Sequence, residues 1–313
     1  MSMESQIHNP ELTRLLKNKA YELGFSFCGV AEAQFLDEEA SSLELWLKRG
    51  YNSGMDYMAN YFDTRLDPRV LLPGARSVIS LAFNYFPNQN QPDEAPFKIS
   101  KYAYGIDYHE VIREKLSCLA EFLRQCAGDI HIRTFVDSAP VLERAWAVKA
   151  GIGWIGRNSM LISRRNGSFF FLAELITDLQ LKFDTPLGRN YCGDCSLCVD
   201  ACPTGAITDF TIDASRCISY LTIELKDQLS PAPKGSYGEW IFGCDICQDV
   251  CPWNRFSTPH SEPKLTPLPG LLELSAIDWE QMNDILFKQM FHHSAIKRTK
   301  LLGIKRNINF LKD

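Results

Sequence analysis

The residues most able to do chemistry in this chain are its cysteines: of eleven in 313 residues, eight lie between Cys192 and Cys251. The first four follow the spacing C-x2-C-x2-C-x3-C-P, which ends at Cys202-Pro203. The other four are a single cysteine, Cys217, and a C-x2-C-x3-C-P run that ends at Cys251-Pro252. Thiolates at this spacing are typical of bacterial proteins that hold two 4Fe–4S clusters.

In such motifs the fourth cysteine of each run ligates the cluster of the other run. The spacing therefore predicts two crossed sets of ligands. The first cluster is assigned to Cys192, Cys195, Cys198 and Cys251, and the second cluster to Cys202, Cys217, Cys244 and Cys247. Four thiolates for each cluster leave no ligand over, and this match favours iron–sulfur clusters over other uses of cysteine.

Two alternatives remain open from the residues alone. Zinc is also held by paired C-x2-C motifs, although it does not require the x3-Cys-Pro step that occurs twice here. Disulfide frameworks belong mainly to small secreted domains. This chain is long, and its opening residues, Met-Ser-Met-Glu-Ser-Gln, lack the basic and apolar segments of an export signal. We therefore expect a cytoplasmic protein in a reducing compartment.

The composition is that of an ordinary globular protein, with 45% hydrophobic and 23% charged residues. No apolar run is long enough to span a membrane, so no membrane partner is expected. The net charge of −5 gives no indication of a polyanionic partner. The C-terminus differs, since residues 287–312 contain cations but no acid. These cations are Lys288, Lys297, Arg298, Lys300, Lys305, Arg306 and Lys312.

Hydrophobic periodicity and turn residues predict three parts. Residues 1–185 read as an α/β (α+β) domain, 186–256 as a ferredoxin-like domain with the two clusters, and 257–313 as a Pro-rich linker and a basic helical tail that packs back as a cap. The expected helices lie at 10–23, 41–48, 138–151 and from about 109 to 125. The expected strands lie at 27–31, 77–85, 131–137, 158–163 and 168–177, the last two joined as a hairpin at Asn166-Gly167.

Two other patterns carry less chemistry. Gly151-Ile-Gly-Trp-Ile-Gly156 matches the letters of the dinucleotide fingerprint, but it follows a predicted helix, whereas the fingerprint follows a strand. Gly151 is therefore expected to end that helix. The remaining cysteines, Cys28, Cys118 and Cys126, are expected to be small buried side chains.

Asp137 is the best candidate for proton chemistry in the first domain. It follows a predicted strand and precedes a predicted helix, the position at which open α/β sheets bind ligands. Alternatively, Asp137 belongs with Ser138 to the cap of that helix. The residues alone leave both interpretations open.

Taken together, these stretches resemble the epoxyqueuosine reductase family over residues 10–256. The cluster motifs, such as Cys244-Asp-Ile-Cys-Gln-Asp-Val-Cys-Pro-Trp-Asn254, would fit many proteins by themselves. The match becomes specific together with Val136-Asp-Ser-Ala-Pro140 and Ala150-Gly-Ile-Gly-Trp154. Further matches are Arg65-Leu-Asp-Pro68, Pro73-Gly-Ala-Arg-Ser77, Tyr102-Ala-Tyr-Gly-Ile-Asp-Tyr-His109 and Cys217-Ile-Ser-Tyr-Leu-Thr-Ile-Glu224.

The resemblance implies a reduction of epoxyqueuosine to queuosine at the wobble position of tRNA, the last step of queuosine biosynthesis. It also implies a cobalamin-binding first domain, related to reductive dehalogenases, that receives electrons from the clusters and from an unidentified reductant. Asp137 matches the family's proton donor. The implied cobalamin contacts are Arg65, Ser100, Asp137, Leu161, Leu172, Ser219 and Gln248.

This sequence departs from the family in two respects. Ser100 stands where some members have cysteine, so a thiol there is not essential. Longer members continue into helical repeats that help to hold tRNA. We expect the basic tail to contact tRNA phosphates in a monomeric protein, the alternative being a solvated helix face. Two other functions were weighed: another corrinoid iron–sulfur reductase of the dehalogenase type, and an electron-transfer ferredoxin module.

Overall fold

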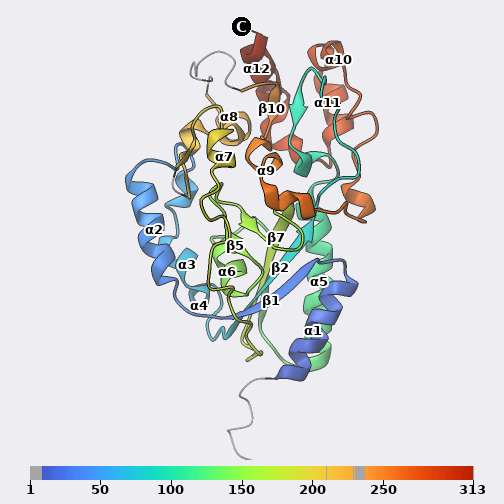
Figure 1. Cartoon of the computed structure of the whole chain (residues 1–313). Coiled ribbons are helices and arrows are strands. Elements are labelled where there is room, and N and C mark those ends of the chain that lie inside the picture. The colour runs from blue at the N-terminus through green and yellow to red at the C-terminus, as the bar shows by residue number, and fades with distance from the viewer. Residues whose placement is uncertain (1–8, 209, 228, 230–236, 313) are drawn as a thin grey trace, which may run out of the picture.

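The computed structural model describes residues 9–208, 210–227, 229 and 237–312. The expectation of no export signal rests on residues 1–8, which lie outside the described residues. Its largest sheet has four strands in the order β1-β2-β7-β4 (Figure 1). These strands are β1 (Phe27–Glu32), β2 (Ser77–Asn84), β4 (Ile132–Phe135) and β7 (Phe170–Thr177). All three pairings are antiparallel. The rule for ligand sites in open α/β sheets applies to mostly parallel sheets, so it does not support the candidate site at Asp137.

Helices cover both faces of this sheet. Helices α1 (Pro10–Glu22) and α5 (Tyr108–Ala127) pack on one face, and α6 (Glu143–Lys149) packs on the other. Alternation along β2 separates the two cores, because Ile79 and Leu81 join the α1/α5 side while Val78 and Ala82 join the α6 side. Beside the α6 core lie the shorter helices α2 (Asp37–Lys48), α3 (Phe62–Leu66) and α4 (Pro68–Leu71).

Two local predictions in this part were wrong. Ser138 does not cap a helix, because α6 begins at Glu143 after an irregular stretch, and its N-cap is Leu142. The Asn166-Gly167 turn closes only one isolated bridge, between Ser163 and Gly167. Both edges of β7 are already occupied by β2 and β4, so the preceding strand β6 (Leu161–Ile162) pairs instead with β5 (Trp154–Ile155).

The Gly-x-Gly-x-x-Gly stretch lies as the sequence predicts. Helix α6 ends at Lys149, and Gly151 follows it with a left-handed φ of 75°, a conformation that favours glycine. The chain then enters β5, not a helix, so the arrangement of a dinucleotide fingerprint is missing. Among the remaining cysteines, Cys28 is buried as expected, whereas Cys118 and Cys126 are exposed because they lie on the outer side of α5.

The cysteine-rich segment folds into short elements. They are α7 (Leu197–Asp200), β8 (Ile207–Thr208), β9 (Thr211–Ile212), α8 (Ile218–Ile223), β10 (Trp240–Phe242) and α9 (Ile246–Asp249). Strand β10 pairs in parallel with β3 (Lys98–Ile99), which comes from the first 185 residues. This pairing ties the cysteine-rich segment to the larger sheet domain.

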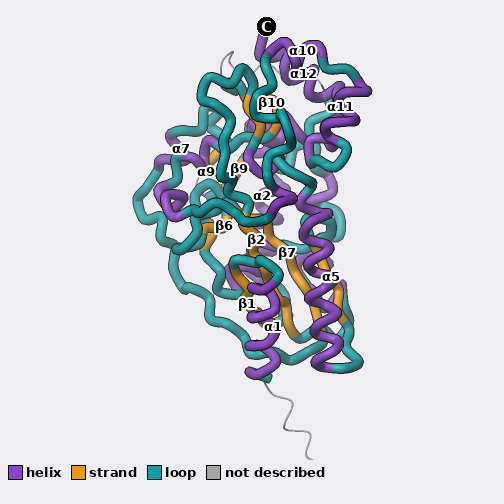
Figure 2. The backbone as a smooth tube through the Cα atoms, turned by 90° about the vertical axis from the view of Figure 1, so that its right-hand side faces the viewer, coloured by secondary structure: helices purple, strands orange, loops and turns teal. Residues whose placement is uncertain are grey.

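The C-terminal residues are helical, as predicted, and comprise α10 (Ala276–Gln281), α11 (Asp284–Phe291) and α12 (Lys300–Lys312). Figure 2 shows them gathered with β10 at one end of the protein. Their buried Trp279, Phe291 and Ile304 share a core with Ile99 and Phe242, so the tail packs back onto both preceding parts. Within the described residues, no helix is both long and apolar enough to cross a membrane.

Gly29 offers a test of how tightly α6 is held against the sheet. A Cβ at Gly29 would lie 2.1 Å from the backbone oxygen of Ala150, which no side-chain rotation can relieve. We expect Gly29→Ala to destabilise the protein by at least about 1–3 kcal/mol, the usual cost of overpacking. The control Glu32→Ala changes an exposed side chain of the same strand. Anaerobic thermal unfolding measures the melting temperatures of both variants. Equal melting temperatures for Gly29→Ala and Glu32→Ala would refute the close contact between Gly29 and Ala150.

Candidate active site and cluster-binding segment

The four cysteines of the predicted first cluster line one small cavity. Cys192, Cys195, Cys198 and Cys251 surround it together with Arg157, Asn158 and Trp253. Three of the cysteines come from one loop around α7, and Cys251 comes from the residues after α9. The structure therefore brings together two stretches that lie more than fifty positions apart in the sequence.

The other four cysteines lie near one another and are partly screened from solvent. Burial raises the pKa of the Cys244 and Cys247 thiols, and the neighbouring Cys217 raises it further. The Cys202 sulfur accepts a hydrogen bond from the Ala206 backbone N–H at 3.3 Å, a contact typical of ligand thiolates. Because thiolates are costly to crowd in such a place, this set requires a compensating positive centre.

Asp137 lies in the irregular loop between β4 and α6. Its φ of 44° places it in the left-handed region, which is uncommon for residues other than glycine, although aspartate adopts it more readily than most. Two hydrogen bonds hold it: the Tyr108 hydroxyl donates to Asp137 Oδ2 at 2.5 Å, and the Asp137 backbone N–H donates to Glu143 Oε1 at 2.7 Å. His109 Nε2 lies 3.8 Å from the same Oδ2. The Asp137 side chain is still 60% exposed, so the carboxylate remains available to another molecule.

The surrounding protein perturbs the titratable side chains near Asp137. Arg144 and Tyr57 are exposed, yet burial lowers the pKa of Arg144 and raises that of Tyr57. Burial also raises the pKa of half-buried Glu143 to about 8, and the charge of Asp137 contributes. Several acid–base groups with shifted pKa values therefore lie close to the Asp137 carboxylate.

Charges from the C-terminal half also reach this site. Arg298, which lies just before α12, forms an ion pair with Glu224 at 2.7 Å. The charges of Glu224, Arg298 and Asp137 all act on the Tyr57 hydroxyl, so the tail and the end of α8 lie near the Asp137 loop. Sequence reasoning did not single out Tyr57, Tyr108, Glu143 or Glu224, and it named Arg298 only as one of the basic residues of the tail. Of these, Tyr108 and Glu224 belong to the motifs that carry the family resemblance.

The other residues expected to contact a cofactor come from several different elements. Arg65 is buried and donates from Nη2 to the Tyr57 carbonyl at 2.9 Å, while its Nε has no partner within the described residues. Leu161 and partly buried Leu172 pack in the α6 core. Ser219 lies in the first turn of α8, two residues after Cys217.

Ser100 and Gln248 are buried and already engaged by protein groups. The Ser100 hydroxyl donates to Asp245 Oδ1 at 2.5 Å. Gln248 accepts from Ser168 at 2.9 Å and donates to the Tyr85 hydroxyl at 3.2 Å. Both residues therefore stiffen the junction between the sheet domain and the cysteine-rich segment.

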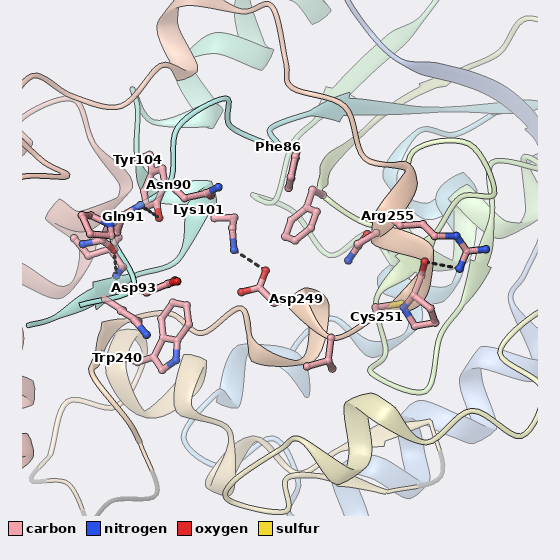
Figure 3. Close-up of a pocket in the computed structure, with 17 residues that line it drawn as sticks. Phe86, Asn90, Gln91, Asp93, Lys101, Tyr104, Trp240, Asp249, Cys251 and Arg255 are labelled. Atoms are coloured by element: carbon pink, nitrogen blue, oxygen red, sulfur yellow. Dashed lines mark hydrogen bonds and ion pairs between the residues drawn. The ribbon is translucent and has the colours of Figure 1, made fainter. Parts of the chain in front are cut away.

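A separate cavity of about 620 Å³ lies between the 86–104 connection and α9 (Figure 3). Lys101 and Asp249 form an ion pair at 2.6 Å inside it. Cys251 is the only one of the predicted site residues that lines it. This cavity is therefore distinct from the site around Asp137.

Comparisons with known proteins place these features in a family. Residues 65–138 match the family described as epoxyqueuosine reductase QueG, DUF1730, and residues 191–254 match the 4Fe-4S double cluster binding domain. The epoxyqueuosine reductase of Cellulophaga algicola is 55% identical over 299 residues, which cover 95% of this chain and 97% of that protein.

Two solved structures are also similar over most of their length. A crystal structure of epoxyqueuosine reductase with an epoxyqueuosine-modified tRNA-Tyr stem loop has a TM-score of 0.89 and 32% identity, covering 96% of this chain and 80% of that one. A Bacillus subtilis epoxyqueuosine reductase, with its catalytic aspartate loop swung out of the active site, has a TM-score of 0.88 and 31% identity, covering 96% and 81%. On this sequence and structural similarity, the chain belongs to the epoxyqueuosine reductase family.

Proposed function

We propose that this protein reduces the epoxide of epoxyqueuosine in tRNA to the alkene of queuosine. The observation that carries the proposal is Asp137, which has a left-handed φ and an accessible carboxylate held by Tyr108 and Glu143, in a chain that also carries eight cluster-type cysteines. The family and the stem-loop complex of a relative support tRNA as the substrate. The direct test is turnover of epoxyqueuosine-containing tRNA by the anaerobically reconstituted protein.

We assign the parts of the chain to the parts of this reaction. Residues 1–185 would hold cobalamin and the modified base, residues 186–256 would form a ferredoxin-like domain with both clusters, and residues 257–313 would cap the junction. Helix α8 supports an order for the clusters, because Cys217 is its N-cap and Glu224, its C-cap, lies near the Asp137 loop. The second cluster would then deliver electrons to the active site and the first cluster would receive them.

The residues around Asp137 fit cobalamin. The unpartnered Nε of buried Arg65 can donate to one of the amide side chains of a corrin. The contacts that we assign are Arg65, Ser100, Asp137, Leu161, Leu172, Ser219 and Gln248. Bound cobalamin would supply a strong reductant at the substrate, which the protein's own side chains lack.

The protein's own chemistry is the delivery of protons. Conversion of an epoxide to an alkene consumes two electrons and two protons and releases the oxygen as water. Because an alkoxide is a poor leaving group, a general acid lowers the barrier. Tyr108 occupies Asp137 Oδ2, which leaves Oδ1 to carry a proton towards the substrate oxygen. Glu143 acts as a positioning residue, since it accepts from the Asp137 backbone.

The tail would link tRNA binding to the active site. Lys297 pairs with Asp107 and Glu110, and Arg298 pairs with Glu224, so these cations are partly neutralised within the protein. Lys300 is exposed and follows directly at the start of α12. We propose that this segment contacts tRNA phosphates near the modified nucleotide. We further propose a monomeric, cytoplasmic enzyme that takes electrons from a separate reductant.

The cluster assignment predicts about eight iron and eight sulfide per chain after anaerobic reconstitution, at four of each per cluster. Cys251→Ser should lose about half of both, because only the first cluster loses a ligand. The control Cys126→Ser changes an exposed cysteine of α5 and should keep the full content. Stoichiometric zinc without sulfide would refute the clusters, and selective loss of the second cluster in Cys251→Ser would refute the crossed ligation.

The role of Asp137 predicts a selective loss of chemistry in Asp137→Asn. This variant keeps the size of the side chain and can still accept from Tyr108, but it has no acidic proton. Single turnover with pre-reduced cobalamin should slow roughly 100-fold or more, while cluster content and tRNA affinity stay unchanged. Asp129→Asn, an exposed position before β4, serves as the control. A near wild-type rate would remove Asp137 from the mechanism.

The environment of Glu143 predicts a pH-dependent stability. Burial raises its folded-state pKa from the ordinary 4.5 to about 8, so its contribution to the free energy of unfolding is fully present below about pH 4.5 and is lost as pH rises towards 8. Glu143→Gln removes this titration and keeps an acceptor for the Asp137 backbone. Across pH 5–8 the melting temperature of the wild type should therefore fall more steeply than that of the variant.

Anaerobic thermal scans at one heating rate provide the comparison, since every other titrating group is common to both proteins. Glu143→Ala, which also removes the acceptor, should reduce the single-turnover rate, whereas Glu143→Gln should largely retain it. Parallel melting curves for the wild type and Glu143→Gln would show that Glu143 titrates normally.

A further inference from the structure

A group of arginines and aromatic rings lies on the surface next to the cavity of the first cysteine set. Trp253 lines that cavity, and its ring centroid lies 4.9 Å from Trp154, 6.2 Å from Tyr191 and 6.0 Å from Phe256. These rings come from three separate stretches of the chain. They form a continuous layer that starts at the first cluster's cavity and reaches the surface at Phe256, which is 39% exposed.

Arginines cover this layer. Arg164 and Arg189 lie 5.1 and 4.5 Å from the centroid of the Tyr191 ring, and Arg255 lies 4.4 Å from that of Phe256. We call Arg164, Arg189, Arg255, Tyr191, Trp253 and Phe256 the arginine–aromatic face. Figure 3 shows Arg255 beside Cys251, with its guanidinium turned towards the backbone.

The charge on this face is largely uncompensated. The three arginines are exposed, and their contacts are with rings and, for Arg255, the Pro252 carbonyl at 3.0 Å. No carboxylate among the described residues pairs with them, in contrast to Lys297 and Arg298 of the tail. The exposed acids of the neighbouring cysteine loop are Asp194 and Asp200, and Asp200 accepts from Ser196.

We propose that the arginine–aromatic face is the docking surface for an acidic one-electron carrier protein, such as a flavodoxin or a ferredoxin. This inference rests on the proposed function, which needs an external reductant. Arginine and aromatic side chains are the residues enriched in protein interfaces. Unpaired positive charge steers an acidic partner and speeds its encounter, while a small interface lets it leave again, as electron-transfer complexes require.

The position of the face fits the entry of electrons. The arginine–aromatic face adjoins the first cysteine set. The second set includes Cys217, the N-cap of α8, and the other end of this helix lies near the Asp137 loop. Each docking would pass one electron from the reduced carrier to the oxidised first cluster, leaving the carrier oxidised by one electron. Two dockings supply the two electrons that one epoxide consumes, and the two protons enter separately at the active site.

The test removes charge from the face and keeps the cluster ligands. The triple variant Arg164→Gln, Arg189→Gln and Arg255→Gln loses three positive charges. Its matched control replaces Arg49, Arg113 and Lys182, which are exposed on other elements, with glutamine. The partner is a purified acidic flavodoxin. We measure its affinity for the cluster-loaded protein over a range of salt concentrations, and the rate at which reduced flavodoxin bleaches the cluster absorbance.

The triple variant should bind flavodoxin roughly tenfold more weakly, with a flatter salt dependence and slower bleaching, as expected for interface charges that guide association. The control should match the wild type. Bleaching by reduced methyl viologen, a small cation, should not slow in either protein, and turnover with this reductant should be retained. Such retention separates failure of the docking proposal from failure of the proposed function.

Two results would overturn the proposal. Flavodoxin affinity that is unchanged in the triple variant, or that does not fall with salt in the wild type, excludes this face as the docking surface. Loss of tRNA affinity with unchanged flavodoxin affinity would identify it as a nucleic-acid surface instead. Since the wild-type salt dependence requires no substitution, a variant that fails to retain its clusters still leaves the proposal testable.

Discussion

The antiparallel pairing of β2 with β7 over eight residues, from Ser77 opposite Thr177 to Asn84 opposite Phe170, is the constraint on which the rest of this structure depends. It fixes which side chains of β2 face the α1/α5 core and which face α6. It also gives β4 an edge to pair with, and the end of β4 leads into the Asp137 loop. On the opposite side, Gly29 lets α6 approach β1 closely enough to complete the second core.

The pairing of β2 with β7 also places a buried acid, Glu174, opposite Ser80. Glu174 of β7 is fully buried, and burial raises its pKa well above the ordinary value, with a further contribution from Glu143. A neutral carboxyl is the form that a low-dielectric interior favours. The hydroxyl of Ser80, on β2, donates to it at 3.2 Å. Burial and the charge of Asp137 together raise the pKa values of both Glu174 and Glu143.

Buried hydrogen bonds between polar side chains join the sheet domain to the cysteine-rich segment. Ser100 donates to Asp245, the residue after Cys244, and Gln248 joins Ser168 to Tyr85. Buried polar networks of this kind fix one relative position, because a shifted arrangement leaves donors and acceptors unpaired. Electron transfer benefits from that rigidity, since the distance between the cysteines and the active site stays constant.

The sequence by itself determined the chemistry of the cysteines and most of the elements. Spacing along the chain is local information, and α1, β1, β2, α5 and the helical tail formed close to where periodicity placed them. Local patterns do not determine the antiparallel direction of the strands, the strands that pair with β7 or the residue at which α6 begins; the tertiary structure decided these. It also chose the residues around Asp137, because Tyr57 and Arg298 come from distant segments. Their charges meet only when the tail packs back onto the sheet domain, and pairing over such separations depends on the packing of the whole chain.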